Sequence, residues 1–424
     1  MANTQTQTNE LNYIRSLAEK VCEIAVSDEM NDRRNLWSDH NSLILTPPLI
    51  YIRAYAEWEI PELKPVCADD YLRRLEIYFK NILYRYSLGD DSIFEPWYSV
   101  RADFIIPDGG LWGFPVTVTR PTDENGKQRA GSFIFNPAIV KDEDINKFVK
   151  PFHRVNEEKT KEIFDKTSEI LKGIMPVVVD RSPVYTLWNA DISTQLAYIR
   201  GLEGMMWDMV DRPEWLHKIV SFMSENIADV QNTAEIAGDF TLYCQDNQSM
   251  PYARDLPRPS ADTAPAERSK IWTFCASQET AAVSPEMWEE FILNYQKPTY
   301  SKYGLLSYGC CEDMTHKFPI VKREMKNLRR VAVTPWADMR SCSEQLGSDY
   351  IMAWRPSPTD MVAVDFDPER TKKVTREAFR LARENKNHID VTLKDVETVS
   401  GKLDSVKNFV KAVRDVIEEG EWVW

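Results

Sequence analysis

The segment YGCCED (308–313) carries the densest group of reactive side chains in the chain. Two adjacent thiols, Cys310 and Cys311, stand beside the carboxylate of Glu312 and follow the apolar run GLLSYG (304–309). A thiolate and a carboxylate with one or two further ligands suit a zinc ion that keeps one coordination position open. Adjacent residues of a strand point to opposite faces, so we expect only Cys311 to face the site. Burial of both cysteines as small apolar side chains is the alternative.

Glu279 is the second candidate, because it ends another apolar run, IWTFCASQ (271–278), shortly before a predicted helix start at Ser284. Neighbouring parallel strands lie about 5 Å apart, so their ends meet. We therefore expect Glu279 and Cys311 to share one pocket, with Glu279 as a metal ligand or a general acid. A helix cap or a solvent-exposed carboxylate is the alternative interpretation.

Further candidates come from the rule that the chemistry of a barrel enzyme lies at the carboxyl ends of its strands. The predicted catalytic residues are Glu279, Glu312 and Asp338, and the predicted metal ligands are Cys311, Glu279, Cys310 and His388. Five aromatic side chains are predicted to wall a flat substrate: Tyr308, Trp97, Trp188, Trp336 and Trp354. The chain has no GxSxG, P-loop or GxGxxG motif, so a serine hydrolase, an NTPase and a Rossmann enzyme have no support.

The elements that must position these residues alternate regularly. Apolar strand-like runs separate amphipathic helical segments, which predicts an α/β protein with a parallel sheet closed into a single (β/α)8 TIM barrel. We expect a helical N-terminal extension over 1–45, the barrel over 46–424 and a hairpin excursion over about 108–136. The predicted strands are 47–55, 92–100, 176–183, 240–246, 271–278, 304–309, 329–335, 350–356 and 389–395.

The composition of the chain limits the classes of molecule that it is expected to bind. The net charge of −14 and the pI near 5.1 disfavour nucleic acid and anionic membranes. No apolar stretch is long enough to cross a membrane, and the polar start MANTQTQTNE shows no secretory signal. Seven scattered cysteines favour a reduced, cytoplasmic setting. The aromatic end EEGEWVW is a candidate contact for a second subunit, so a homodimer is one expectation.

The stretch SQETAAVSPEMWEEFILNYQKPTYSKYGLLSYGCCED resembles the uroporphyrinogen-decarboxylase superfamily, and within it the corrinoid-linked methyltransferases. LRRVAVTPWADM, EQLGSDYIMAWRPSP and VTLKDVETVSGKLDSVKNFV follow the same pattern, so the resemblance covers about residues 170–418, with GCCE as its most specific part. It implies a uroporphyrinogen-decarboxylase-like barrel with zinc at its mouth. It also implies transfer of a methyl group from a small donor, such as a methoxylated aromatic compound, to cob(I)alamin on a separate corrinoid protein, as in the first methyltransferase of an O-demethylase.

The sequence departs from this family at one position. One branch uses a His-x-Cys motif and a later Cys, whereas this chain has Gly309-Cys310-Cys311, with His388 near the place of the later ligand. The zinc ligands that the resemblance implies for this chain are therefore Cys311 and Glu279. The segment YIRAYAEWEI, with one Arg and two Glu, suits a polycarboxylate substrate poorly. The alternatives to a methyltransferase are a decarboxylase of the same superfamily and a noncatalytic barrel of a corrinoid pathway.

Overall fold

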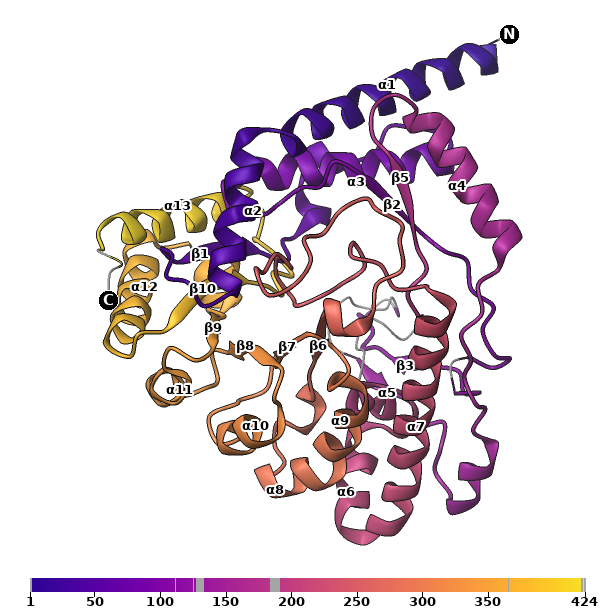
Figure 1. The fold of residues 1–424 in the computed structure, drawn as a ribbon, viewed down its shortest axis with the longest axis vertical. Helices are drawn as coiled ribbons and strands as arrows, with labels where there is room; N and C mark the ends of the chain where they lie inside the picture. Colours follow the sequence, from indigo (N-terminus) through magenta and orange to yellow (C-terminus); the bar gives the residue numbers. More distant parts are fainter. Residues whose placement is uncertain are drawn as a thin grey trace.

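Six parallel strands form one curled sheet at the centre of the protein (Figure 1). The structure is a computed structural model that describes residues 2–110, 112–124, 126, 133–183, 191–364, 366–420 and 422. The order in the sheet is β1-β10-β9-β8-β7-β6, with bounds β1 (Leu49–Ile52), β6 (Trp272–Cys275), β7 (Leu305–Tyr308), β8 (Leu328–Val333), β9 (Ile351–Trp354) and β10 (His388–Leu393). Almost every residue of these strands is buried, as expected for a parallel sheet covered on both faces.

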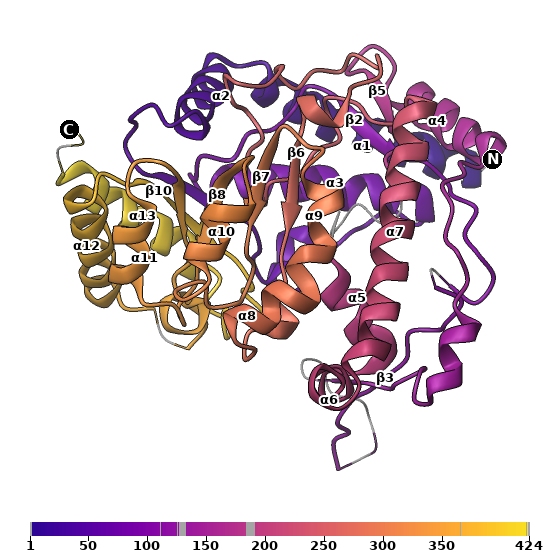
Figure 2. The same ribbon diagram turned by 60° about the horizontal axis from the view of Figure 1, so that its bottom comes forward.

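Helices follow the strands and cover the outer face of the curl (Figures 1 and 2). They are α8 (Pro285–Trp288), α9 (Asn294–Tyr300), α10 (Phe318–Glu324), α11 (Met339–Leu346), α12 (Pro368–Glu384) and α13 (Ser405–Glu418). Local chemistry marks several starts, since Ser284, Asp338 and Asp367 each accept a hydrogen bond from a backbone N–H of the first turn. The alternation predicted for the second half of the chain is therefore confirmed.

Apart from β1, part of the first half of the chain builds a separate layer. Strands β2 (Tyr98–Arg101) and β5 (Val177–Asp180) pair in parallel as a two-stranded sheet of their own. They pack with helices α1 (Ala2–Ala25), α3 (Asp70–Ser87) and α4 (Glu157–Leu171) around a second apolar cluster. Within residues 1–45 the chain forms α1 and α2 (Asp28–Asn41), and within 108–136 β3 (Val118–Thr119) and β4 (Ile134–Phe135) form an antiparallel pair.

The remaining helices lie on the β6 side of the sheet (Figure 2). They are α5 (Ile192–Arg200), α6 (Leu202–Asp211) and α7 (Pro213–Ala237), and α7 packs against α9. Among the described helices, none has a stretch long and apolar enough to cross a membrane.

The predicted ring of eight paired strands is found only in part, because side chains cap both edges of the six-stranded sheet. At β1, the backbone N–H of Ile50 donates to Asp91 Oδ2 at 2.7 Å and that of Ile52 to Asp90 Oδ2 at 2.8 Å. At β6, the N–H of Trp272 donates to Gln245 Oε1 at 3.0 Å. Carboxylate and amide oxygens thus satisfy edge donors that a neighbouring strand would otherwise pair.

The predicted strand 240–246 is wrong, since the segment forms turns. Gln245 Nε2 donates to Leu242 O at 2.7 Å, and Asp246 Oδ1 accepts from the N–H of Gln248 at 2.7 Å. Such local side-chain bonds compete with a strand ladder. The loop that follows contacts the end of α2, where Asn41 Nδ2 donates to the carbonyl oxygens of Met250 and Tyr252, both at 2.7 Å.

Candidate functional site

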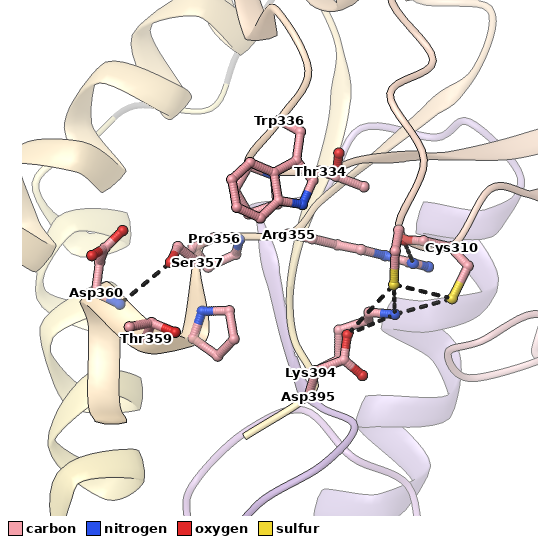
Figure 3. A pocket seen from close by; sticks show the side chains of 13 residues that line it. Cys310, Thr334, Trp336, Arg355, Pro356, Ser357, Thr359, Asp360, Lys394 and Asp395 are labelled. Carbon is pink, nitrogen blue, oxygen red and sulfur yellow. Dashed lines mark hydrogen bonds and ion pairs between the residues drawn. The ribbon is translucent and has the colours of Figure 1, made fainter. Parts of the chain in front are cut away.

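A pocket of about 410 Å³ lies at the carboxyl ends of four consecutive strands of the sheet (Figure 3). Cys310 and Cys311 follow β7, Trp336 follows β8, Arg355 follows β9, and Lys394 follows β10. The rest of the lining is Thr334, Pro335, Pro356, Ser357, Pro358, Thr359, Asp360 and Asp395. The strand-end rule therefore located the pocket, and of its predicted residues Cys310, Cys311 and Trp336 lie together here.

Both thiols face one ammonium group, so the expectation that only Cys311 faces the site is wrong. Lys394 Nζ lies 3.0 Å from Cys310 Sγ and 3.2 Å from Cys311 Sγ. The two sulfurs are 3.8 Å apart, with Cys310 buried and Cys311 exposed. The strand ends at Gly309, whose φ of 97° turns the chain, so the alternation of side chains along a strand no longer applies.

The charges around the pair favour one thiolate. The hydrogen bond from Cys311, together with the charges of Lys394 and Arg355, lowers the pKa of Cys310 to about 6, against the opposing effect of burial. The same hydrogen bond and burial raise the pKa of Cys311. At neutral pH the pair therefore holds a single negative charge next to the Lys394 ammonium, and a thiolate is the form that acts as nucleophile or metal ligand.

Glu312 holds the backbone of this site rather than lining the pocket. Its Oε1 accepts from the N–H of Ser277 at 2.9 Å, and its Oε2 accepts from the N–H of Cys310 at 2.7 Å. The residue is fully buried, and it ties the loop after β6 to the loop after β7. The structure thus gives the predicted catalytic carboxylate a positioning role.

Glu279 belongs to a different group of side chains. Its carboxylate accepts from Ser193 Oγ at 2.8 Å and from Thr194 Oγ1 at 2.7 Å, both in α5. Ser193 Oγ also lies 3.0 Å from Asp191 Oδ1. Burial and the charge of Glu279 raise the pKa of Asp191 to about 8. Glu279 is not part of the pocket lining, and its described hydrogen bonds do not reach Cys311.

Three further predicted residues serve the fold. Asp338 caps α11 by accepting from the N–H of Ser341 at 3.0 Å. The buried Tyr308 hydroxyl lies 3.0 Å from Ser277 Oγ. Trp354 is buried with its ring edge-on to another aromatic ring.

The other predicted residues lie away from the pocket or outside the description. His388 begins β10, whereas Lys394 follows its end, and at ~3.3 Å per residue these positions are roughly 20 Å apart. His388 as a ligand beside Cys311 is therefore wrong. Trp97 is half-buried just before β2, and Trp188 lies outside the described residues.

The donor set partly suits zinc. Two Zn–S bonds of about 2.3 Å at a tetrahedral angle place the sulfurs about 3.8 Å apart, which is the separation of Cys310 and Cys311. Asp395 Oδ2 lies 3.7 Å from Cys311 Sγ as a third donor. The Lys394 ammonium, however, occupies the point between these groups, and within the described part of the chain no three His, Cys, Asp or Glu side chains enclose a metal position. A zinc ion here would have to displace Lys394.

Sequence reasoning missed Lys394 and Asp395 as site residues. Both end the strand IDVTLKD (389–395), so the rule that identified Cys311 also applies to them. Asp191 is the N-cap of a helix, a position that indicates a structural role in the sequence. Only the structure shows that it lies close enough to Glu279 for the charge of Glu279 to raise its pKa.

The comparisons with known proteins are sparse. No family model matches the chain, and no curated protein matches it. Among solved structures, a methyltransferase from Methanosarcina mazei aligns with a TM-score of 0.42 at 12% sequence identity, over 90% of this chain and 98% of that one. A likeness at this level carries no argument about activity.

Proposed function

We propose that this chain is a methyltransferase that moves a methyl group from a small methylated donor, such as a methoxylated aromatic compound, to the cob(I)alamin of a separate corrinoid protein. The observation that carries the proposal is the pair Cys310–Cys311 beside Lys394, in a pocket at the strand ends. The GCCE segment, on which the family resemblance mainly rests, supplies both thiols.

The residues of the chain would bind and orient the donor. The pocket presents the exposed ring of Trp336 as an apolar wall, and Glu312 fixes the backbone of Cys310. Orientation of the methyl group and exclusion of water are what such a reaction needs from the protein, because the partner supplies the cobalt nucleophile. Glu279, the predicted general acid, does not line this pocket, so it could act on the departing oxygen only if the bound donor extends beyond the lining residues.

Zinc, which the family resemblance implies, would be held by Cys310, Cys311 and Asp395 once Lys394 turns away. When bound it would supply Lewis-acid activation of the donor oxygen. In that arrangement the Lys394 ammonium and the metal compete for the same thiolates.

The test combines cobalt spectroscopy with metal analysis. The purified chain is incubated with chemically reduced cob(I)alamin and a panel of methoxyarenes, and the loss of the Co(I) absorbance and the formation of methylcobalamin are followed. We expect transfer by the unaltered chain and by Cys22→Ala, whose thiol lies on α1, and loss of transfer and of zinc in Cys311→Ala. Unchanged metal content in Cys311→Ala would rule out that ligand, and zinc-loaded protein that transfers no methyl group would contradict the proposal.

The decarboxylase alternative has a specific observation in its favour, since Arg355 and Lys394 line the pocket and are groups that bind carboxylates. Release of CO₂ from carboxylate substrates, with no methylation of cobalt, would favour that alternative.

A further inference from the structure

Arg355 differs from the other buried arginines of the described chain in having no carboxylate partner. Four arginines are buried there. Three of them form ion pairs, namely Arg34 with Glu95 at 3.2 Å, Arg268 with Glu235 at 2.8 Å, and Arg330 with Asp390 at 2.6 Å. No described carboxylate lies within 4.0 Å of the Arg355 guanidinium, although only 2% of this residue is exposed.

Its contacts are with neutral oxygens. Arg355 Nη1 donates to Cys310 O at 2.5 Å and Nη2 to Gln248 Oε1 at 3.2 Å, while the buried Nε has no hydrogen-bond partner in the described structure. Burial and the neighbouring charges of Arg330 and Arg53 hold its pKa below the usual range. A buried charge without a counter-ion is costly, so the site gains from an anion.

The nearby anions are already engaged by another cation. Lys394 Nζ lies 2.9 Å from Asp395 Oδ2 and 3.0 Å from Cys310 Sγ. The thiolate and the carboxylate thus lie in direct contact with the ammonium. Arg355 interacts with the charge of the thiolate, but its hydrogen bonds go to the carbonyl oxygen of Cys310 and to Gln248 Oε1.

Arg355 faces the same pocket as Trp336, and Figure 3 shows its side chain running from Pro356 toward the thiols, between the indole ring and Lys394. We propose that the methyl donor is an anion whose carboxylate binds to Arg355 while its flat ring lies against Trp336, an inference that rests on the proposed function. The planar fork of a guanidinium matches a carboxylate, and a cavity of about 410 Å³ admits a single-ring compound.

The test measures binding without any methyl transfer. Benzoate and benzamide have the same ring and shape but differ in charge, so their dissociation constants for the full chain are compared by calorimetry. We expect benzoate to bind roughly tenfold or more tightly than benzamide, and Arg355→Gln to bring the two constants close together. Asp360→Asn, which removes a negative charge from the far end of the pocket, is the control and should not lower the preference for benzoate.

Equal binding of the two ligands, no binding of benzoate, or a preference that survives Arg355→Gln would each overturn the inference. If Arg355→Gln does not fold, the comparison of benzoate with benzamide on the unaltered chain still decides. The result is also distinct from a failure of the proposed function. If benzoate binds through Arg355 but the chain does not methylate cobalt, the anion site is supported and the proposed function fails. If neutral and anionic methoxyarenes react equally well, the proposed function is supported and the anion site is excluded.

Discussion

Two charged clusters on neighbouring strands of the sheet are built in opposite ways. Within the sheet, Arg330 of β8 donates from both terminal nitrogens to Asp390 of β10, and His40 Nε2 lies 3.1 Å from the same carboxylate. At the strand ends, the hydrogen bonds of Arg355 to described residues go only to neutral acceptors. In the first cluster a carboxylate of the chain balances the charge of the arginine, so this cluster serves the fold, whereas in the second no described carboxylate pairs with the guanidinium, which leaves a place for an anionic ligand.

The largest expected effect is on the cluster within the sheet. Asp390→Asn removes the charge that offsets Arg330 in a fully buried site, so we expect a loss of about 3–5 kcal/mol in the free energy of unfolding. Urea unfolding measures the change. Asp395→Asn is the control, because that side chain is half exposed at the strand end and its replacement should cost under about 1 kcal/mol. Equal costs for the two substitutions would contradict the comparison.

Acid should weaken the same cluster. Burial alone would raise the pKa of Asp390, but the charge of Arg330 and the contact with His40 lower it to about 2. The folded value thus lies below the unfolded value of about 3.9, so this stabilisation is present above pH 4 and is lost as pH falls toward 2. We expect roughly 2–3 kcal/mol to disappear over that interval, measured by urea unfolding at stepped pH. In Asp390→Asn this part of the pH dependence should vanish, and its persistence would assign the effect to other groups.

At the strand ends, Lys394→Gln should change reactivity more than stability. Without the ammonium, the pKa of Cys310 should rise from about 6 toward the ordinary range of a thiol, because the thiolate loses its nearest cation. The pH profile of iodoacetamide labelling, followed by mass spectrometry of the peptide that holds both cysteines, measures the shift. An unchanged profile would show that Lys394 does not stabilise the thiolate.

The smallest expected effect on stability is at the pocket wall. Trp336 is 77% exposed, so Trp336→Ala should change the free energy of unfolding by no more than about 0.5 kcal/mol while weakening binding of aromatic ligands. Trp354→Ala, on the buried side of the neighbouring strand, should cost about 3–5 kcal/mol. Thermal unfolding and benzoate binding of both variants separate the two roles, and a Trp336→Ala variant with unaltered benzoate binding would remove the ring from the site.

Features that depend on the apolar pattern of the sequence could be predicted, and features that depend on side-chain hydrogen bonds could not. The strands β6 to β10 are continuous apolar runs, which is why their positions and the pocket at their ends could be predicted. Segment 240–246 has a similar apolar start, but Gln245 and Asp246 bond to nearby backbone and to the edge of β6, and no periodicity reveals that choice. The thiols were found, and Lys394 was missed although it stands at a strand end in the same way.

By itself, the sequence determined the alternation of strands and helices and the placement of two cysteines after a glycine, because these depend on apolar pattern and local backbone conformation. Only the tertiary structure decided that Lys394 contacts both thiols, that Glu279 and Asp191 share Ser193, and that Arg355 has no carboxylate partner among the described residues. Ion pairing depends on distances of a few ångströms between residues far apart in the chain, and those distances exist only once the strands are in register.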